Sequence, residues 1–204
     1  AALSEEERTR RSNVQGIYFE DDYERVYPLE DLACDVIGFT DAGNTADWGL
    51  EGYYNSTLTG TDGRQYGYFN DSSDVEQTII EATDGQSIVS TLDVGAQSIV
   101  EKYVNAFQEA MGAENLGVIV EDPSTGEIIA MDGGDRYDLN EPRDMSSIYT
   151  DAQVEAMSDE EEVEALNSMW RNYCVTDAYE PGSVVKPIVM AAALEKGAIS
   201  EDDT

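Results

Sequence analysis

A serine and a lysine three residues apart are the strongest candidates for chemistry in this sequence. Ser183 and Lys186 lie in the run Glu-Pro-Gly-Ser-Val-Val-Lys-Pro at 180–187. Residues three apart lie one turn apart on the same helix face, so the hydroxyl and the amine can approach each other. A serine hydroxyl is a weak nucleophile unless a base accepts its proton, and burial favours the neutral amine that can do so. The pair therefore predicts nucleophilic catalysis, with Ser183 as nucleophile and Lys186 as general base.

The segment around this pair predicts a buried helix over 183–195. Pro181 and Gly182 interrupt the chain just before Ser183, and Gly197 closes the helix. The residues after Lys186 are almost all apolar, and a helix that is apolar all round is normally buried. Spacing alone is weak evidence, because an N-capping serine and a surface lysine give the same pattern. The predicted burial is what favours a catalytic pair.

Histidine is absent, and cysteine is limited to Cys34 and Cys174. The lack of histidine excludes Ser-His-Asp and Cys-His catalysis and every histidine-containing zinc site. The two cysteines are too far apart in sequence for a Cys-x-x-Cys site. Two buried free thiols are the favoured interpretation, and a long-range disulfide is the alternative. We expect neither a cofactor nor a metal.

The chain is strongly acidic, with 44 Asp and Glu against 11 Lys and Arg and a net charge of -33. Such a charge repels phosphate backbones, which argues against nucleic-acid binding. It favours solubility and carries no information about fold. The acid-rich stretch 151–164 is interpreted as a solvated helix face, with a mobile lid as the alternative.

Hydrophobic periodicity predicts helices and strands in alternation along the chain. The helix over 94–111 has the clearest pattern, with Asp93 as N-cap. Its expected buried stripe comprises Ile99, Val100, Tyr103, Val104 and Phe107. The other predicted elements are helices over 29–37 and 48–58, strands over 64–69, 88–92, 116–120 and 127–131, an extended stretch over 15–27 and a turn at 70–74.

The run around Ser183 resembles the active-site segment of class B penicillin-binding proteins, the peptidoglycan transpeptidases. Val184 and Val185 depart from the Thr and Phe usual there. Stretches 25–28, 36–40, 49–51 and 58–64 resemble the family's non-catalytic pedestal. Further matches in the same order are 89–93 with Gln97 at the start of the transpeptidase domain, 122–131 at its first hairpin, and 137–140 with Asn172 before the serine. In the pedestal, Arg25, Glu51 and Arg64 are either ion-paired or simply exposed.

The resemblance implies an α+β fold in two parts. Residues 1–85 would be the C-terminal part of a small mixed pedestal, or dimerisation, domain. Residues 86–204 would be the N-terminal part of a penicillin-binding/β-lactamase-like transpeptidase domain, truncated after the Ser-x-x-Lys helix. The family's Ser-x-Asn and Lys-Thr-Gly elements are absent from these 204 residues. We therefore expect the chain alone to be inactive and a longer parent to be the enzyme.

By the same resemblance, the parent would cross-link peptidoglycan through an acyl-serine intermediate formed from D-Ala-D-Ala stem peptides, and would bind β-lactams. Cell-wall synthesis proteins are expected partners, and a homodimer is possible. The implied location is the extracytoplasmic face of a bacterial membrane, held by one N-terminal anchor absent from this chain. Two alternatives remain: a non-catalytic scaffold that binds partners, and a β-lactamase or β-lactam sensor that uses the same Ser-x-x-Lys.

Overall fold

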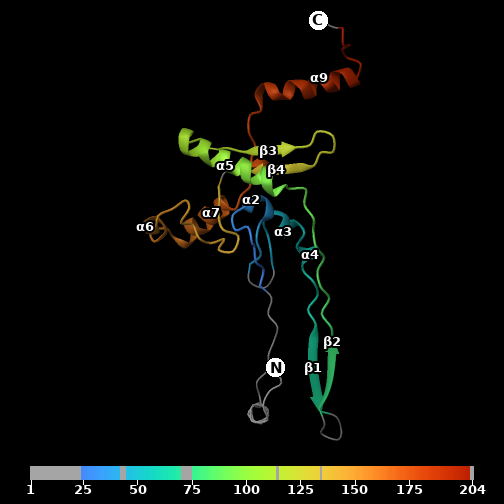
Figure 1. The fold of residues 1–204 in the computed structure, drawn as a ribbon, viewed down its shortest axis with the longest axis vertical. Coiled ribbons are helices and arrows are strands. Elements are labelled where there is room, and N and C mark those ends of the chain that lie inside the picture. Colours follow the sequence, from blue (N-terminus) through green and yellow to red (C-terminus); the bar gives the residue numbers. More distant parts are fainter. Residues whose placement is uncertain (1–23, 42–44, 70–74, 114, 134, 203–204) are drawn as a thin grey trace.

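The computed structural model describes residues 24–41, 45–69, 75–113, 115–133 and 135–202 (Figure 1). Short helices and two separate two-stranded antiparallel sheets make it a mixed α+β structure. The predicted turn at 70–74 and most of the predicted extended stretch at 15–27 lie outside the described residues. The helices are α2 (Cys34–Ile37), α3 (Gly49–Tyr53), α4 (Asn55–Leu58), α5 (Val94–Met111), α6 (Asp151–Val154), α7 (Asp159–Met169), α8 (Tyr173–Thr176), the 3-10 helix η1 (Gly182–Val185) and α9 (Lys186–Glu195).

Helix α5 has the predicted bounds and the predicted cap. Asp93 Oδ1 accepts a hydrogen bond from Ala96 N at 2.8 Å, and the helix ends at Gly112, whose φ is 61°. The predicted apolar stripe is buried only in part, however: Val104 is 4% exposed and Val100 is half-buried. Helix α5 buries Gln97, Glu101 and Val104, while three members of the stripe are about half exposed or more: Ile99, Tyr103 and Phe107. The helix turns this polar side inward because Gln97 bonds to the backbone of Met131 in the neighbouring strand, while Glu101 accepts from the backbone N–H of Ala33 and pairs with Arg136.

That neighbour is the predicted hairpin, formed by β3 (Val118–Glu121) and β4 (Ile128–Asp132). Val118 pairs with Asp132, and a bulge lies between Val120 and Glu121. Gly126, with φ of 79°, closes the turn by donating from its N–H to Asp122 O at 2.8 Å. Pro and Gly in 122–126 thus form the tight turn that their chemistry predicts. Helix α5 packs against β4 (Figure 1).

A second hairpin, β1 (Arg64–Phe69) with β2 (Val75–Ile80), projects from the body as a separate arm (Figure 1). Strand β1 confirms the strand predicted at 64–69. The strand predicted at 88–92 is wrong: these residues pair with no strand in the described part of the chain. A strand requires a neighbour to receive its backbone hydrogen bonds, and the alternating pattern alone cannot supply one.

The remaining helices are shorter than their periodicity predicted. Turns occupy 28–33, so only α2 forms within 29–37, and the helix predicted over 48–58 divides at Tyr54 into α3 and α4. The acid-rich stretch forms α6 and α7, and its acids lie on the exposed face of α7 while Leu166 and Met169 are buried. The solvated-face interpretation is therefore confirmed.

One hydrophobic core joins the early and late parts of the chain. Phe39 packs edge-on against Trp170, with ring centroids 5.0 Å apart, and against Tyr137 at 6.0 Å. The core therefore draws on both 1–85 and 86–204, and the division into two domains at that point stays a prediction. Its buried members are Tyr27, Cys34, Phe39, Tyr137, Leu139, Met145, Ala165, Leu166, Met169 and Trp170.

Candidate active site

Ser183 and Lys186 lie at the junction of η1 and α9, so the single helix predicted over 183–195 begins as a 3-10 turn. The backbone N–H of Lys186 donates to the carbonyl of Ser183. In a 3-10 turn, residues three apart eclipse each other. The two residues therefore share one face, as their spacing predicts. Gly182 precedes them with φ of 57°, a left-handed conformation that glycine adopts without strain.

The predicted burial of this helix is wrong for the chain as it folds here. Neither η1 nor α9 buries a residue, and Ser183 and Lys186 are both exposed. Ile188 is 69% exposed and Val189 is 59% exposed. Figure 1 shows α9 standing apart from the body of the molecule, beyond the β3–β4 hairpin. Among the residues described, no hydrogen bond joins the two side chains.

A buried polar cluster lies where α2, α5 and β4 meet. We call it the polar junction: Asp35, Gln97, Glu101, Asp132 and Arg136. The sequence did not predict that these residues come together. Gln97 pairs with the backbone of β4 twice, donating from Nε2 to Met131 O at 2.7 Å and accepting at Oε1 from Met131 N at 2.9 Å. It also donates to Glu101 Oε1 at 2.8 Å. The only signal in the sequence was the pair of polar residues four apart on α5.

Arg136 is the cation of the polar junction. Its Nη1 lies 2.5 Å from Glu101 Oε2, and its Nη2 lies 2.7 Å from Asp132 Oδ2. Glu101 Oε1 also accepts from the backbone N–H of Ala33 at 2.8 Å, which ties α5 to the start of α2. The junction therefore fastens α2, α5 and β4 to one another through charged groups.

Asp35 links the polar junction to the chain that leads to Ser183. Its Oδ2 accepts from Gly133 N at 2.7 Å, and its backbone carbonyl accepts from Asn172 Nδ2 at 3.3 Å. Asn172 in turn caps α8, accepting from Cys174 N at 2.9 Å. Burial raises the pKa of Asp35 to about 6. This carboxyl, with its raised pKa, belongs to the polar junction, and no hydrogen bond or ion pair joins it to Ser183 among the described residues.

The two cysteines are free, as the favoured interpretation expected. Cys34 is buried, and burial raises the pKa of its thiol to about 12. Cys174 is only half-buried, and burial again raises its pKa. Thiols are nucleophilic as thiolates, so neither cysteine competes with Ser183 for that role.

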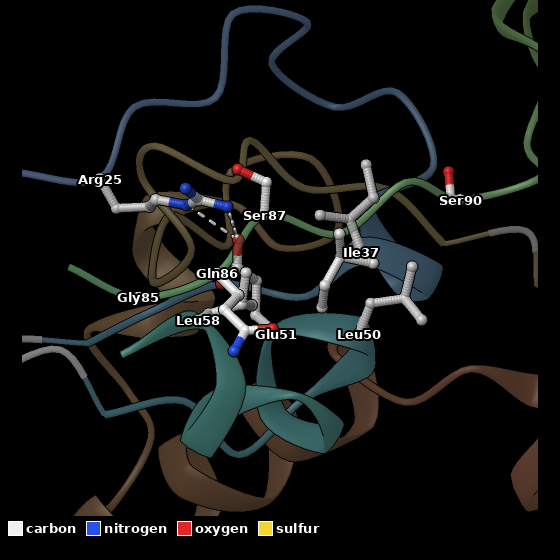
Figure 2. A pocket seen from close by; sticks show the side chains of 10 residues that line it. Arg25, Ile37, Leu50, Glu51, Leu58, Gly85, Gln86, Ser87 and Ser90 are labelled. Atoms are coloured by element: carbon white, nitrogen blue, oxygen red, sulfur yellow. Dashed lines mark hydrogen bonds and ion pairs between the residues drawn. The ribbon is translucent and has the colours of Figure 1, made fainter. Parts of the chain in front are cut away.

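The Arg25–Glu51 ion pair, one of the two possibilities left open by the sequence, is present. Arg25 Nε donates to Glu51 Oε1 at 2.8 Å, and Glu51 is only 4% exposed. The pair lines a cavity of about 470 Å³ between α3, α4 and the segment 85–90 (Figure 2). The cavity is thus lined by residues from both sides of the boundary predicted at 85/86.

The sequence of this chain is similar to those of known penicillin-binding proteins. Residues 116–204 match the family model "Penicillin binding protein transpeptidase domain". The probable peptidoglycan D,D-transpeptidase PenA of Neisseria gonorrhoeae is 32% identical over 197 residues, which are 94% of this chain and 30% of that protein. The chain is a relative of the class B penicillin-binding proteins.

Two solved structures superpose on most of the chain. A peptidoglycan synthetase from Bifidobacterium adolescentis is 25% identical, with a TM-score of 0.69, covering 97% of this chain and 33% of its own. Penicillin-binding protein 3 from Mycobacterium tuberculosis, complexed with aztreonam, is 28% identical with a TM-score of 0.59, covering 88% of this chain and 33% of its own. The chain thus spans about a third of the length of these penicillin-binding proteins. Within the described ranges, no helix is both long and apolar enough to cross a bilayer.

Proposed function

We propose that this chain is the segment of a class B peptidoglycan D,D-transpeptidase that carries the nucleophile, Ser183, and the general base, Lys186. The observation that carries the proposal is the placement of both residues on one face of the turn that starts α9. The family relationship over 116–204 supports it. Ser183 and Lys186 as site residues follow from chemistry and resemblance together.

In the proposed reaction, Ser183 Oγ attacks the carbonyl of the penultimate residue in a D-Ala-D-Ala stem peptide. Lys186 accepts the hydroxyl proton, and the terminal D-Ala leaves with a proton as the acyl-serine forms. An amine of a neighbouring stem then attacks the ester, giving the cross-link and restoring the hydroxyl. A β-lactam would acylate the same oxygen, as its presence in the mycobacterial relative's complex suggests.

Residues outside this chain are needed to complete that site. The apolar side chains Ile188 and Val189 of α9 are exposed in this chain, and Lys186 is exposed beside them. We infer that elements from the remaining two thirds of the relatives' length cover α9 in a longer parent, which would lie at the extracytoplasmic face of a bacterial membrane. Cell-wall synthesis proteins and stem peptides would be its partners there.

The test is covalent labelling of the longer parent by a fluorescent penicillin. Ser183→Ala should abolish the labelled band, and Lys186→Ala should slow labelling by about 10²-fold or more, because a general base contributes a factor of that order. Ser98→Ala on α5 is the matched control, since Ser98 is exposed and its hydroxyl donates to Val94 O within the same helix. Undiminished labelling of the Ser183→Ala protein would disprove the assignment.

The 204-residue chain alone should show no labelling under the same conditions. Loss of one oxyanion-hole donor lowers the rate by about 10²–10³-fold, and this chain lacks the whole Lys-Thr-Gly strand. Rapid acylation of the isolated chain would show that the remaining elements are unnecessary.

A further inference from the structure

Residues 87–90 have a backbone that makes no hydrogen bond with any described part of the chain. The flanking residues are fastened: Gln86 N donates to Thr57 O at 2.8 Å, and Asp93 N donates to Ile129 O at 2.9 Å. Between them the chain runs without a turn or bend from β2 towards α5 (Figure 1), and Val89 is 94% exposed. An exposed, unpaired stretch of strand-forming residues is a template for another strand.

This stretch borders open space. Ser87 and Ser90 line the cavity of about 470 Å³ together with Ile37 and Leu50, and the Arg25–Glu51 pair lies near Ser87 (Figure 2). The space next to the unpaired backbone is therefore already formed. An incoming strand could place apolar side chains against Ile37 and Leu50 without moving the fold.

A second cavity, of about 380 Å³, adjoins the first and shares Arg25 and Glu51 with it. It adds three further acids to the lining: Glu24, Asp62 and Asp84. The guanidinium of Arg25 is the one cation in the two linings, and it is held by Glu51. We call the two cavities with residues 87–90 the edge groove; its lining is negatively charged overall.

We propose that the edge groove binds an extended, lysine- or arginine-bearing segment of a partner protein, which pairs as an added β-strand along residues 87–90. Strand addition obtains affinity from main-chain hydrogen bonds and selectivity from side-chain pockets. The acids of the lining favour a cationic segment. A second copy of this chain is a poor occupant, because each copy has a net charge of -33. The inference does not depend on the chemistry of Ser183.

The probe is the fluorescein-labelled peptide Lys-Val-Lys-Val-Lys-Val-Lys, titrated with the full 204-residue chain and followed by anisotropy. Asp62→Lys with Asp84→Lys reverses two exposed charges in the edge groove, and Glu160→Lys with Glu164→Lys reverses two exposed charges on α7. Both double variants have the same net charge. We expect the first pair to weaken binding by about tenfold or more and the second by less than about twofold.

Equal weakening by the two pairs would show general attraction to an acidic chain and would overturn the proposal. Hydrogen exchange tests the strand pairing separately. The amides of 87–90 should exchange rapidly in the free chain and at least about tenfold more slowly with saturating peptide, as ordering into a ladder requires.

Slow exchange of these amides in the free chain would show that the edge is already paired and would refute the proposal. Unchanged exchange on peptide binding would refute strand addition. A peptide-free dimer with protected 87–90 amides, detected by light scattering, would assign the edge groove to a second copy and would likewise refute it.

Discussion

Replacement of Arg136 with methionine should lower the free energy of unfolding by about 3–5 kcal/mol, because it leaves two buried carboxylates, Glu101 and Asp132, without their cationic partner. The Arg136 side chain is 14% exposed, while those of its partners Glu101 and Asp132 are 10% and 4% exposed. Methionine preserves much of the apolar stem, so the loss reports mainly the missing charge. A domain of this kind has a total stability of about 5–15 kcal/mol. The loss is therefore a large share of the whole.

The measurement is urea unfolding followed by circular dichroism at 222 nm. Adding Glu101→Gln to the Arg136→Met variant should restore about 1 kcal/mol or more of the unfolding free energy. The second substitution removes one unpaired buried charge, and the new amide oxygen can still accept from Ala33 N. Arg143→Met is the matched control: Arg143 pairs with Asp41 at 3.0 Å, and their side chains are 61% and 55% exposed. Exposed pairs contribute about 0–1 kcal/mol. If Arg136→Met lowers the unfolding free energy no more than Arg143→Met does, the polar junction does not stabilise the packing of α2, α5 and β4 as its geometry indicates.

Three other outcomes can be measured in the same way. Because burial raises the pKa of Asp35 from 3.8 to about 6, its folded-state pKa exceeds the unfolded one. The unfolding free energy should therefore fall by about 2 kcal/mol as pH rises from about 4 to about 6, and Asp35→Asn should remove that part of the pH dependence. Gly38→Ala should lower the free energy of unfolding by more than about 2 kcal/mol, because φ is 71° and a Cβ would lie 2.0 Å from Trp48 O. Gly112→Ala is the control: its φ is 61° but its surroundings are open, so the loss should be about 1 kcal/mol. Equal losses for the two variants would refute the steric argument. The chain has a net charge of -33, so its acids repel one another in the folded state. Raising NaCl from about 0.05 to about 1 M, where the Debye length shrinks to about 3 Å, should screen this repulsion and raise the melting temperature. A lower melting temperature at high salt would contradict repulsion as the dominant long-range electrostatic effect on stability.

The candidate site was readable from the sequence in its residue types but not in its surroundings. The spacing of Ser183 and Lys186 predicted that they share a face, and the 3-10 turn agrees. The apolar composition of α9 predicted burial, and the described chain leaves that helix exposed. Composition reports what a helix would bury if a partner surface were available, and it cannot supply that surface.

The sequence by itself determined the features whose interactions are local. The helix at 94–111, its Asp93 cap and the 122–126 turn depend on contacts a few residues apart, so their patterns were sufficient. Only the tertiary structure decided the polar junction and the core shared by Phe39 and Trp170. It also decided that 88–92 pairs with no strand among the residues described. Each depends on which segments, tens of residues apart, lie side by side. Side-chain periodicity gives the face of an element and leaves its neighbour unspecified.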